Sequence, residues 1–244
     1  MKTNSAPDAC PLSRSNLYES VDLHRATGKT IRPGGLSLLE YVLTLYPFKA
    51  DSRILDVGCG MGATVSYLRE RYGLRAAGLD LSRKLLAQCM PFLPRLRAHA
   101  EVLPVASCCL EGVVCECVLS LVTDPLRALS EFSRVLTPGG LIILSDIYRR
   151  DPRNNTQDLI TDCCLAGAVT REEVLEWLTK AGFSIILWED HSRLLAELAA
   201  KLIFIYGSMA AFWGQFTQGD EGEKMEKAVK AMRPGYYLIV ASKP

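Results

Sequence analysis

The sequence predicts an α/β protein with a doubly wound, mostly parallel sheet of seven strands. Apolar runs of strand length alternate with segments of helical period along most of the chain. The clearest unit is the apolar stretch 54–57, which leads through Gly58, Gly60 and Gly62 into helical spacing from Ala63. A glycine turn between a strand and a helix lets the backbone and the free N–H groups of the helix approach a nucleotide-like ligand. We therefore expect the ligand site beside this turn, at the carboxyl ends of the strands.

Length and composition place the chain among ordinary globular proteins. Its 244 residues suffice for one well-buried domain with an elaboration, and 49% are apolar against 23% charged. A formal net charge of +1 offers no electrostatic surface for nucleic acid or an acidic membrane, so neither is an expected partner. Nine cysteines, with no signal-peptide pattern at residues 1–11, predict reduced thiols and a cytoplasmic protein. No paired C-x-x-C motifs occur, and no metal site is expected.

The stretch before the glycine turn, residues 1–50, predicts a leader followed by a helical cap. Residues 1–16 are polar and form the leader, whereas residues 17–30 carry scattered apolar side chains that indicate a short helix. A Pro-Gly-Gly break then precedes a second helix at residues 36–45, which ends before a proline.

Residues 51–190 form the predicted ligand-binding core. After the first strand, further strands are predicted at residues 74–80, 96–100, 112–119, 141–148 and 183–188. Helices are predicted between them at residues 83–90, 125–136, 159–165 and 170–180. Three of these helices have clear starts: Ser82 and Asp124 are N-caps, and Thr170 with Glu173 forms a capping box.

The last part of the chain consists of a helical insert at residues 191–233 and a final strand within residues 234–244. The insert contains an uncharged run at residues 202–213, but Glu197 and Lys201 keep the apolar stretch below the length of a membrane span. We expect it to act either as a lid over the substrate pocket or as the contact surface of a homodimer.

The spacing Gly58-x-Gly60-x-x-Ala63 also fits a loose dinucleotide fingerprint. Asp56, two residues before the first glycine, argues against a bound pyrophosphate and suits a cofactor with a cationic amino-acid end. Asp80 closes the second strand, at a spacing suited to hydrogen bonds with ribose hydroxyls. An aspartate after a strand is also a common helix cap, so each carboxylate has a structural reading as well.

A third feature, Glu131-Phe-Ser-Arg-Val-Leu-Thr-Pro-Gly-Gly140 followed directly by a strand, decides the cofactor. Together with the glycine motif and Asp80, it resembles the class I S-adenosylmethionine-dependent methyltransferases over about residues 31–244. The resemblance implies a Rossmann-like methyltransferase fold, S-adenosylmethionine as cofactor and methyl transfer to a small molecule. The cofactor-binding residues that it implies are Asp56, Gly58, Cys59, Gly60, Gly62, Asp80, Leu81, His99, Ala100, Glu101, Cys115 and Glu116.

The resemblance also implies roles within this set. Asp56 helps hold the cofactor ammonium, Asp80 takes the ribose hydroxyls and Leu81 packs on the adenine. His99 stands where the family usually has an aspartate, and it can meet the adenine amino group only as a neutral acceptor. Arg32 is expected to close over the cofactor carboxylate.

The nearest pattern within the family is that of the arsenite methyltransferases, beside a branch of quinone C-methyltransferases. The resemblance places Cys117 and Cys164 where arsenite methyltransferases have metalloid-binding thiolates, and two soft thiolates suit arsenic(III). The third cysteine of those enzymes has no counterpart except Cys10, in the predicted leader. Cys115 and Glu116 are expected to border the cofactor sulfur. The alternative is that the thiols are ordinary buried residues and that the acceptor is a small organic nucleophile.

Methyl transfer requires alignment and desolvation more than a strong base. If a base takes part, the candidates are Tyr148 and Asp146 at the end of the fifth strand, and His24 before the Pro-Gly-Gly break. We take Tyr148, with Cys117 and Cys164, as the candidate catalytic set. The alternative function is a sensor or scaffold that binds S-adenosylmethionine without catalysis.

Overall fold

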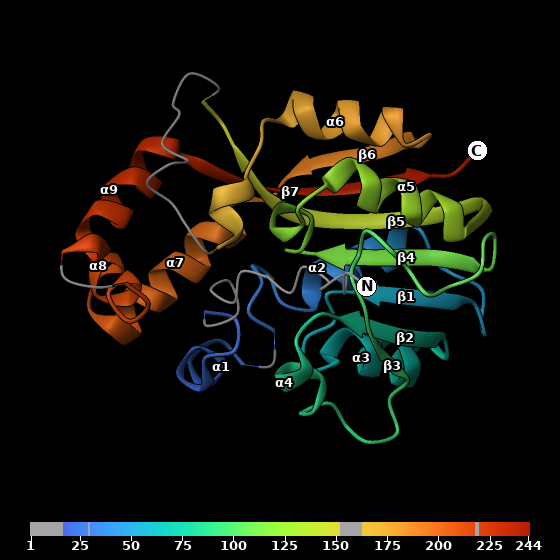
Figure 1. Cartoon of the computed structure of the whole chain (residues 1–244), viewed down its shortest axis with the longest axis horizontal. Helices are drawn as coiled ribbons and strands as arrows, with labels where there is room; N and C mark the ends of the chain where they lie inside the picture. The colour runs from blue at the N-terminus through green and yellow to red at the C-terminus, as the bar shows by residue number, and fades with distance from the viewer. Residues whose placement is uncertain (1–16, 29, 152–162, 218–219) are drawn as a thin grey trace, which may run out of the picture.

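A seven-stranded sheet forms the centre of the molecule. The computed structural model describes residues 17–28, 30–151, 163–217 and 220–244. The strand order is β3-β2-β1-β4-β5-β7-β6, with β7 antiparallel to both neighbours and every other pair parallel (Figure 1). The strands are β1 Arg53–Val57, β2 Arg75–Asp80, β3 Arg95–Arg97, β4 Leu110–Glu116, β5 Leu136–Arg149, β6 Ser184–Asp190 and β7 Pro234–Ser242. The prediction of a doubly wound, mostly parallel α/β sheet is confirmed.

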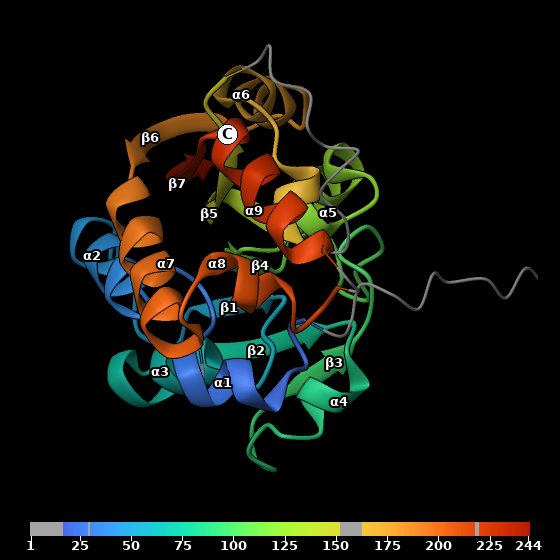
Figure 2. The same ribbon diagram turned by 90° about the vertical axis from the view of Figure 1, so that its left-hand side faces the viewer.

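Helices cover both faces of this sheet (Figure 2). The covering helices are α2 Ser37–Leu45 and α3 Ala63–Tyr72 on one face, and α5 Pro125–Val135 and α6 Arg171–Lys180 on the other. Successive strand residues supply the two cores: Ile54 packs with the α2 and α3 side, and Leu55 packs with the α5 and α6 side. Asp56 follows on the same side as Ile54, so its carboxylate is directed towards the face that α3 covers.

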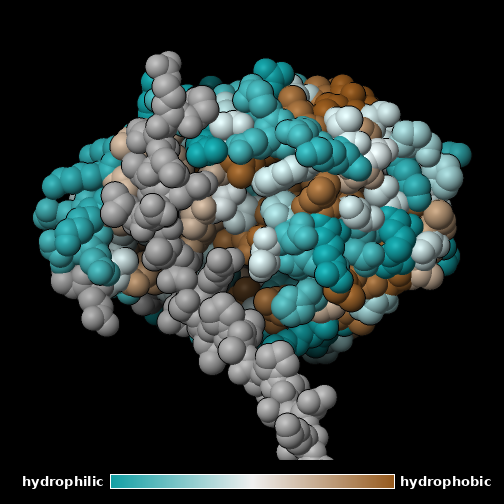
Figure 3. Space-filling view, turned by 45° about the horizontal axis from the view of Figure 1, so that its top comes forward, coloured by the Kyte–Doolittle hydropathy of each residue, from teal (hydrophilic) through white to brown (hydrophobic). Residues whose placement is uncertain are grey.

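A further group of helices lies beyond the carboxyl ends of β1, β2 and β4 (Figures 1 and 2). These are α1 Val21–Thr27, α7 Ser192–Tyr206, α8 Met209–Trp213 and α9 Glu221–Met232. We call α7, α8 and α9 the helical insert. Polar side chains cover much of its outer surface, and apolar side chains are visible where it meets the rest of the molecule (Figure 3). The insert thus stands at the edge of the sheet where open α/β folds bind ligands.

The fourth strand is shorter than its apolar run predicts. The prediction extended it to Leu119, but β4 stops before Cys117, which has a left-handed φ of +57°. The chain then forms the 3₁₀ turn η1, Leu119–Leu121. Ser120 donates from its backbone N–H and its hydroxyl to the Asp146 carboxylate, at 2.9 and 2.7 Å. These two hydrogen bonds hold the turn against β5, so the apolar run leaves the sheet early.

Other boundaries also differ from the prediction. Helix α4 covers only Arg83–Leu86, and β3 lies at residues 95–97 instead of 96–100. The fifth strand already begins at Leu136, five residues before the predicted start, because its first part pairs with β4. The helix predicted at residues 159–165 falls mostly outside the described residues, and η3, Cys164–Gly167, is a 3₁₀ turn. Within the described segments, no helix has the length and apolarity needed to cross a membrane.

Candidate active site

The glycine turn after β1 combines tight packing with open space. Gly58, Gly60 and Gly62 all have left-handed φ values, of +76°, +53° and +79°. A Cβ on Gly58 would lie 2.0 Å from Val118 Cγ2, so this glycine is required by packing against the chain after β4. A Cβ on Gly60 would meet nothing within 4 Å. The turn therefore leaves room beside Gly60 for a ligand to approach the backbone.

Asp80, at the end of β2, ties this turn to α4. Its Oδ2 accepts a hydrogen bond from the Gly60 N–H at 2.8 Å, and its Oδ1 accepts one from the Ser82 N–H at 2.8 Å. Burial raises the Asp80 pKa, and the N–H donors of Ser82 and Gly60 oppose that rise. Leu81 follows with 45% of its surface exposed, unusual for a leucine beside a buried loop. The carboxylate of Asp80 and the apolar surface of Leu81, both expected from the sequence, thus lie next to each other beside the glycine turn.

Three charged side chains form a buried cluster between the turn and the end of β4, and we call Arg32, Asp56 and Glu116 the ion cluster. Asp56 is 3% exposed and Glu116 is 8% exposed. Arg32 Nη2 lies 2.9 Å from Glu116 Oε2, while Arg32 Nε donates to the Gly35 carbonyl at 3.0 Å. Thr64 Oγ1 approaches the same Glu116 oxygen at 3.5 Å.

Two atoms of the ion cluster are buried without a hydrogen bond. One is Asp56 Oδ2 and the other is Arg32 Nη2, whose contact with Glu116 has the distance of an ion pair but not the angle of a hydrogen bond. Buried polar atoms without partners are rare in folded proteins and are costly when nothing binds them. An acceptor without a partner, in one cluster with a guanidinium that makes an ion pair but no hydrogen bond at Nη2, is suited to a ligand that carries both an ammonium and a carboxylate group.

Comparison with known proteins points to one family. A family model described as a methyltransferase domain matches residues 55–144. An uncharacterized protein of Haemophilus influenzae is 30% identical over 190 residues, 73% of each chain. Phosphoethanolamine N-methyltransferase 1 of Zea mays is 24% identical over 201 residues, 78% of this chain and 40% of that protein. Arsenite methyltransferase of Halobacterium salinarum is 26% identical over 146 residues, 54% of this chain and 37% of that protein.

A solved structure shares the fold over almost the whole chain. Phosphoethanolamine N-methyltransferase 2 of Haemonchus contortus, in complex with phosphomonomethylethanolamine and S-adenosylhomocysteine, has a TM-score of 0.73 at 19% identity. The superposition covers 91% of this chain and 56% of the nematode chain. This chain belongs to the class I S-adenosylmethionine-dependent methyltransferases. It spans about half or less of the phosphoethanolamine and arsenite enzymes that it matches.

The residues of this methyltransferase fit its cofactor, S-adenosylmethionine. Arg32 Nη2, which makes an ion pair but no hydrogen bond, and the unpartnered Asp56 Oδ2 offer a donor and an acceptor for the amino-acid end. The open space at Gly60 and the exposed Leu81 offer a surface for the nucleoside end. Arg32 comes from the segment between α1 and α2, far from the glycine motif in the sequence, so it is the fold that brings the two together.

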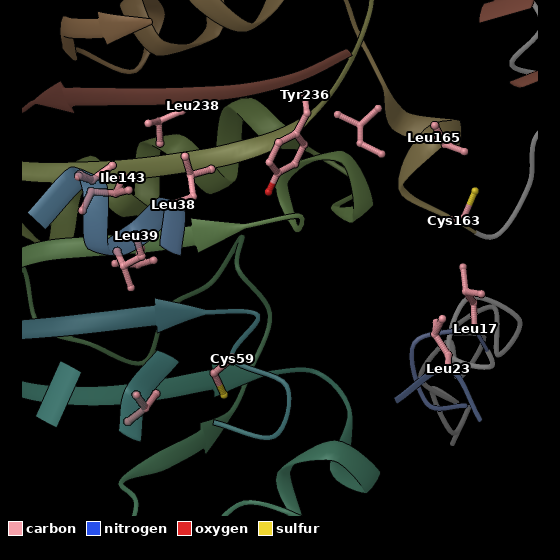
Figure 4. Close-up of a cluster of buried hydrophobic side chains, with 14 of the residues drawn as sticks. Leu17, Leu23, Leu38, Leu39, Cys59, Ile143, Cys163, Leu165, Tyr236 and Leu238 are labelled. Atoms are coloured by element: carbon pink, nitrogen blue, oxygen red, sulfur yellow. The ribbon is translucent and has the colours of Figure 1, made fainter. Parts of the chain in front are cut away.

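Two thiols of the methyltransferase lie at the carboxyl edge, each beside a tyrosine. Cys117 Sγ is 3.4 Å from Tyr236 Oη, and the Tyr236 hydroxyl donates to Ser145 Oγ at 2.9 Å. The Cys164 N–H donates to Tyr18 Oη at 2.8 Å. Figure 4 shows the Tyr236 hydroxyl directed away from β7, towards the end of β4. Neither tyrosine was among the predicted site residues, because no local pattern marks a residue that reaches a cysteine more than 100 positions away.

Both thiols are kept in the neutral form. Burial raises the Cys117 pKa well above its ordinary value, and nearby Asp146 and Cys164 raise it further. Burial also raises the Cys164 pKa, with Cys163 as the next cause. Cys117 and Cys164 both pack against the core on the α2 and α3 side of the sheet. Among the described residues, however, no three His, Cys, Asp or Glu side chains are arranged to hold a metal ion.

Tyr148, the third candidate catalytic residue, is separated from the thiols. Its hydroxyl donates to Asp190 Oδ2 at 2.6 Å, and its ring packs against Trp188 and Tyr237 in the core beneath α5 and α6. Cys115 also lies in that core and is 1% exposed. The structure therefore places Tyr148 and Cys115 on the opposite face of the sheet from the ion cluster.

The two other base candidates have structural partners. Asp146 is 2% exposed and accepts three hydrogen bonds, two from Ser120 and one from the Ile147 N–H. Burial raises its pKa to about 6, against the lowering effect of the Ser120 donors. His24 Nε2 lies 2.9 Å from the Tyr18 carbonyl oxygen, and its Nδ1 is buried without a partner.

The loop expected to read the adenine edge lies after β3. His99 is exposed, Ala100 is 6% exposed, and Glu101 Oε1 accepts a hydrogen bond from the Thr123 N–H at 3.0 Å. Val102 is 58% exposed at the same turn, an apolar side chain that the sequence prediction passed over. The polar edge and the exposed apolar surface needed to contact a purine are both available in this loop.

Proposed function

We propose that this methyltransferase transfers a methyl group from S-adenosylmethionine to a small-molecule acceptor held between the carboxyl edge of the sheet and the helical insert. The observation that supports the proposal best is the ion cluster, in which two buried atoms make no hydrogen bond, together with the open Gly60 turn. The relatives that carry names act on chemically different acceptors, so the acceptor is inferred from the site and not from them.

The roles follow from the charges present. Arg32 would hold the cofactor carboxylate, Asp56 its ammonium and Asp80 the ribose hydroxyls, as the sequence predicts. S-adenosylmethionine supplies an activated methyl group on a sulfonium. The protein contributes alignment and the exclusion of water, for which the deep burial of the ion cluster is the physical basis. No general base is required when the acceptor already carries a lone pair.

Isothermal titration calorimetry with S-adenosylmethionine and S-adenosylhomocysteine tests cofactor binding by the described site. We expect both to bind the wild type and both affinities to fall at least tenfold in Arg32→Met, because the cofactor carboxylate loses its cation. The surface change Arg53→Met, on the exposed partner of Glu111, is the matched control and should leave both affinities unchanged. An Arg32→Met protein that binds as well as the wild type contradicts the proposed site.

A turnover assay separates the enzyme from the non-catalytic alternative. A panel of amines, phosphobases, phenols, thiols and arsenite is incubated with radiolabelled S-adenosylmethionine. Transfer of label to any member establishes catalysis, whereas binding without transfer across the panel favours the sensor or scaffold.

A thiol-bound metalloid is a second candidate acceptor, favoured by the packing of Cys117 and Cys164 against the same core. The raised thiol pKa values oppose it, since each thiol must lose its proton to bind arsenic(III). We expect Cys117→Ser and Cys164→Ser each to weaken arsenite binding at least tenfold, with the exposed Cys108→Ser as control. Unchanged arsenite affinity in both variants leaves the organic acceptor as the remaining candidate.

The insert also offers a contact surface for a second copy. Ile203, Phe204 and Ile205 of α7 are 43%, 91% and 44% exposed, in a continuous apolar run. We infer a homodimer through this face, in a protein whose described cysteines are free thiols, as expected in the cytoplasm. Light scattering after gel filtration should give a dimer for the wild type and a monomer for Phe204→Glu. A monomeric wild type would leave the insert with the role of a lid.

A further inference from the structure

The ion cluster carries more negative than positive charge. Two carboxylates, Asp56 and Glu116, are almost completely buried, and the Arg32 guanidinium is the one cation that acts on both of them among the described residues. The Arg32 and Glu116 side chains are 12% and 3% exposed, so solvent screens their interaction only weakly. With both carboxylates ionised, the cluster has one uncompensated negative charge.

The groups around the cluster do not correct this imbalance. Asp80 faces Asp56 from β2 and adds to the negative potential. Tyr236 from β7 and Cys117 after β4 also interact with the cluster, but both are neutral at ordinary pH because burial raises their pKa values. Compensation must therefore come from a bound proton or from a ligand with net positive charge.

The two ligands of a methyltransferase differ in this property. The methyl donor, S-adenosylmethionine, carries an ammonium, a carboxylate and a sulfonium, and so has a net charge of +1. The demethylated product, S-adenosylhomocysteine, lacks the sulfonium charge and is neutral overall. We propose that Glu116 is a specificity-determining residue: because its carboxylate pairs with Arg32, the carboxylate of Asp56 is left without a cation of its own, and the site prefers the cationic donor to the neutral demethylated product. This inference rests on the proposed function, since it assumes that the cofactor binds at the ion cluster.

When no S-adenosylmethionine is bound, a proton on the ion cluster supplies the positive charge that the cluster lacks. Burial, followed by the charge of Glu116, raises the Asp56 pKa to about 8, so the free protein keeps a proton on the cluster near neutral pH. Donor binding supplies the cation and releases this proton, whereas product binding leaves it in place. After transfer of the methyl group the cluster again lacks its cation, and the weaker hold on the product favours its release.

Calorimetry at about pH 6.5, in two buffers with different ionisation enthalpies, measures affinity and proton release together. For the wild type we expect tighter binding of donor than product, release of close to one proton with the donor, and little release with the product. In Glu116→Gln, the ratio of donor affinity to product affinity should fall about tenfold, because one pKa unit corresponds to a factor of ten. Most of the proton release on donor binding should also be lost. The matched control is Glu111→Gln, on the same strand, where the carboxylate pairs with Arg53 at the surface; it should behave as the wild type.

A second variant and a donor analogue extend the test. Asp56→Asn removes the other carboxylate of the cluster and should lower the donor preference in the same way, should Glu116→Gln fail to fold. A donor analogue with a protonated amine in place of the sulfonium should bind the wild type like the donor, because charge and not the methyl group is recognised. An unchanged ratio of donor to product affinity and an unchanged proton count in both variants overturn the inference. Failure of the wild type to bind either ligand would instead overturn the proposed function.

Discussion

Gly58 and Gly60 of the glycine turn have different surroundings, although both are glycines of one short motif. Gly58 is needed because Val118 occupies the space that a side chain would take, whereas the Cβ position of Gly60 is open and its φ of +53° is left-handed. We expect Gly58→Ala to lower the melting temperature strongly. Gly60→Ala should cost only the roughly 1 kcal/mol of a left-handed alanine but weaken S-adenosylmethionine binding about tenfold or more.

Gly139→Ala is the control for this pair. Gly139 has a φ of +77° and no atom within 4 Å of the position that a Cβ would take, yet it lies near the amino end of β5, far from the turn. It should show the same small loss of stability with unchanged affinity. Thermal unfolding and calorimetry distinguish the cases, and a Gly60→Ala protein with wild-type affinity would contradict the assignment of open space to the ligand.

The residues of the site could be predicted only where a short sequence motif contains them. Asp56, the three glycines and Asp80 are marked by local spacing, and the fold indeed gathers them at one edge. The ion pair of Arg32 with Glu116 was not predicted, because it joins residues far apart in the chain and depends on how the segment before α2 crosses the sheet. Sequence alternation could have indicated that Tyr148 and Cys115 face away from Asp56, but the motifs that suggested their roles carry no such information.

Secondary structure elements carry their own stop and start signals, and α6 has the clearest. Thr170 Oγ1 accepts a hydrogen bond from the Glu173 N–H at 3.3 Å, and Glu173 Oε2 accepts one from the Thr170 N–H at 2.7 Å. Thr170→Ala should lower the free energy of unfolding by about 1 kcal/mol, the usual value of an N-cap. Thr179→Ala, in the exposed last turn of the same helix, should change it by a few tenths at most. Urea unfolding measures both, and equal effects would mean that the cap contributes nothing specific.

Helix starts with such signals were predicted well, whereas the end of β4, which carries none, was not. The starts of α5 and α6 agree with their capping residues Asp124 and Thr170. The end of β4 has no breaker residue: an apolar run continues past it, and only the left-handed Cys117 and the bonds of Ser120 to Asp146 end the strand. Those contacts are tertiary, so no local pattern could reveal them.

The stability of the whole molecule should depend on pH through the ion cluster. The pKa of Asp56 is about 8 in the folded protein and near 4 in the unfolded chain, so the folded state retains a proton that the unfolded state has released. The resulting stabilisation is complete below pH 4 and is lost as pH rises through 8. We expect the ligand-free protein to lose up to about 1.4 kcal/mol per pH unit between about pH 6.5 and about pH 8.

Asp56→Asn tests this dependence, since its amide cannot ionise. The window lies above the pKa of about 6 for Asp146, so that group contributes little there. Urea unfolding at both ends of the window should show the decline in the wild type and a flatter dependence in the variant. Equal slopes would mean that Asp56 ionises freely in the folded protein.

The position of β7 has a consequence for how the molecule is assembled. This strand is the last element along the described chain, yet it lies between β5 and β6, and β6 pairs only with it. During synthesis the first five strands can pair as they emerge, while β6 must wait for a partner that is made some fifty residues later. Tyr236, the hydroxyl neighbour of Cys117, arrives on that same strand. The surroundings of Cys117 are therefore completed last, after the glycine turn and β4 have already formed.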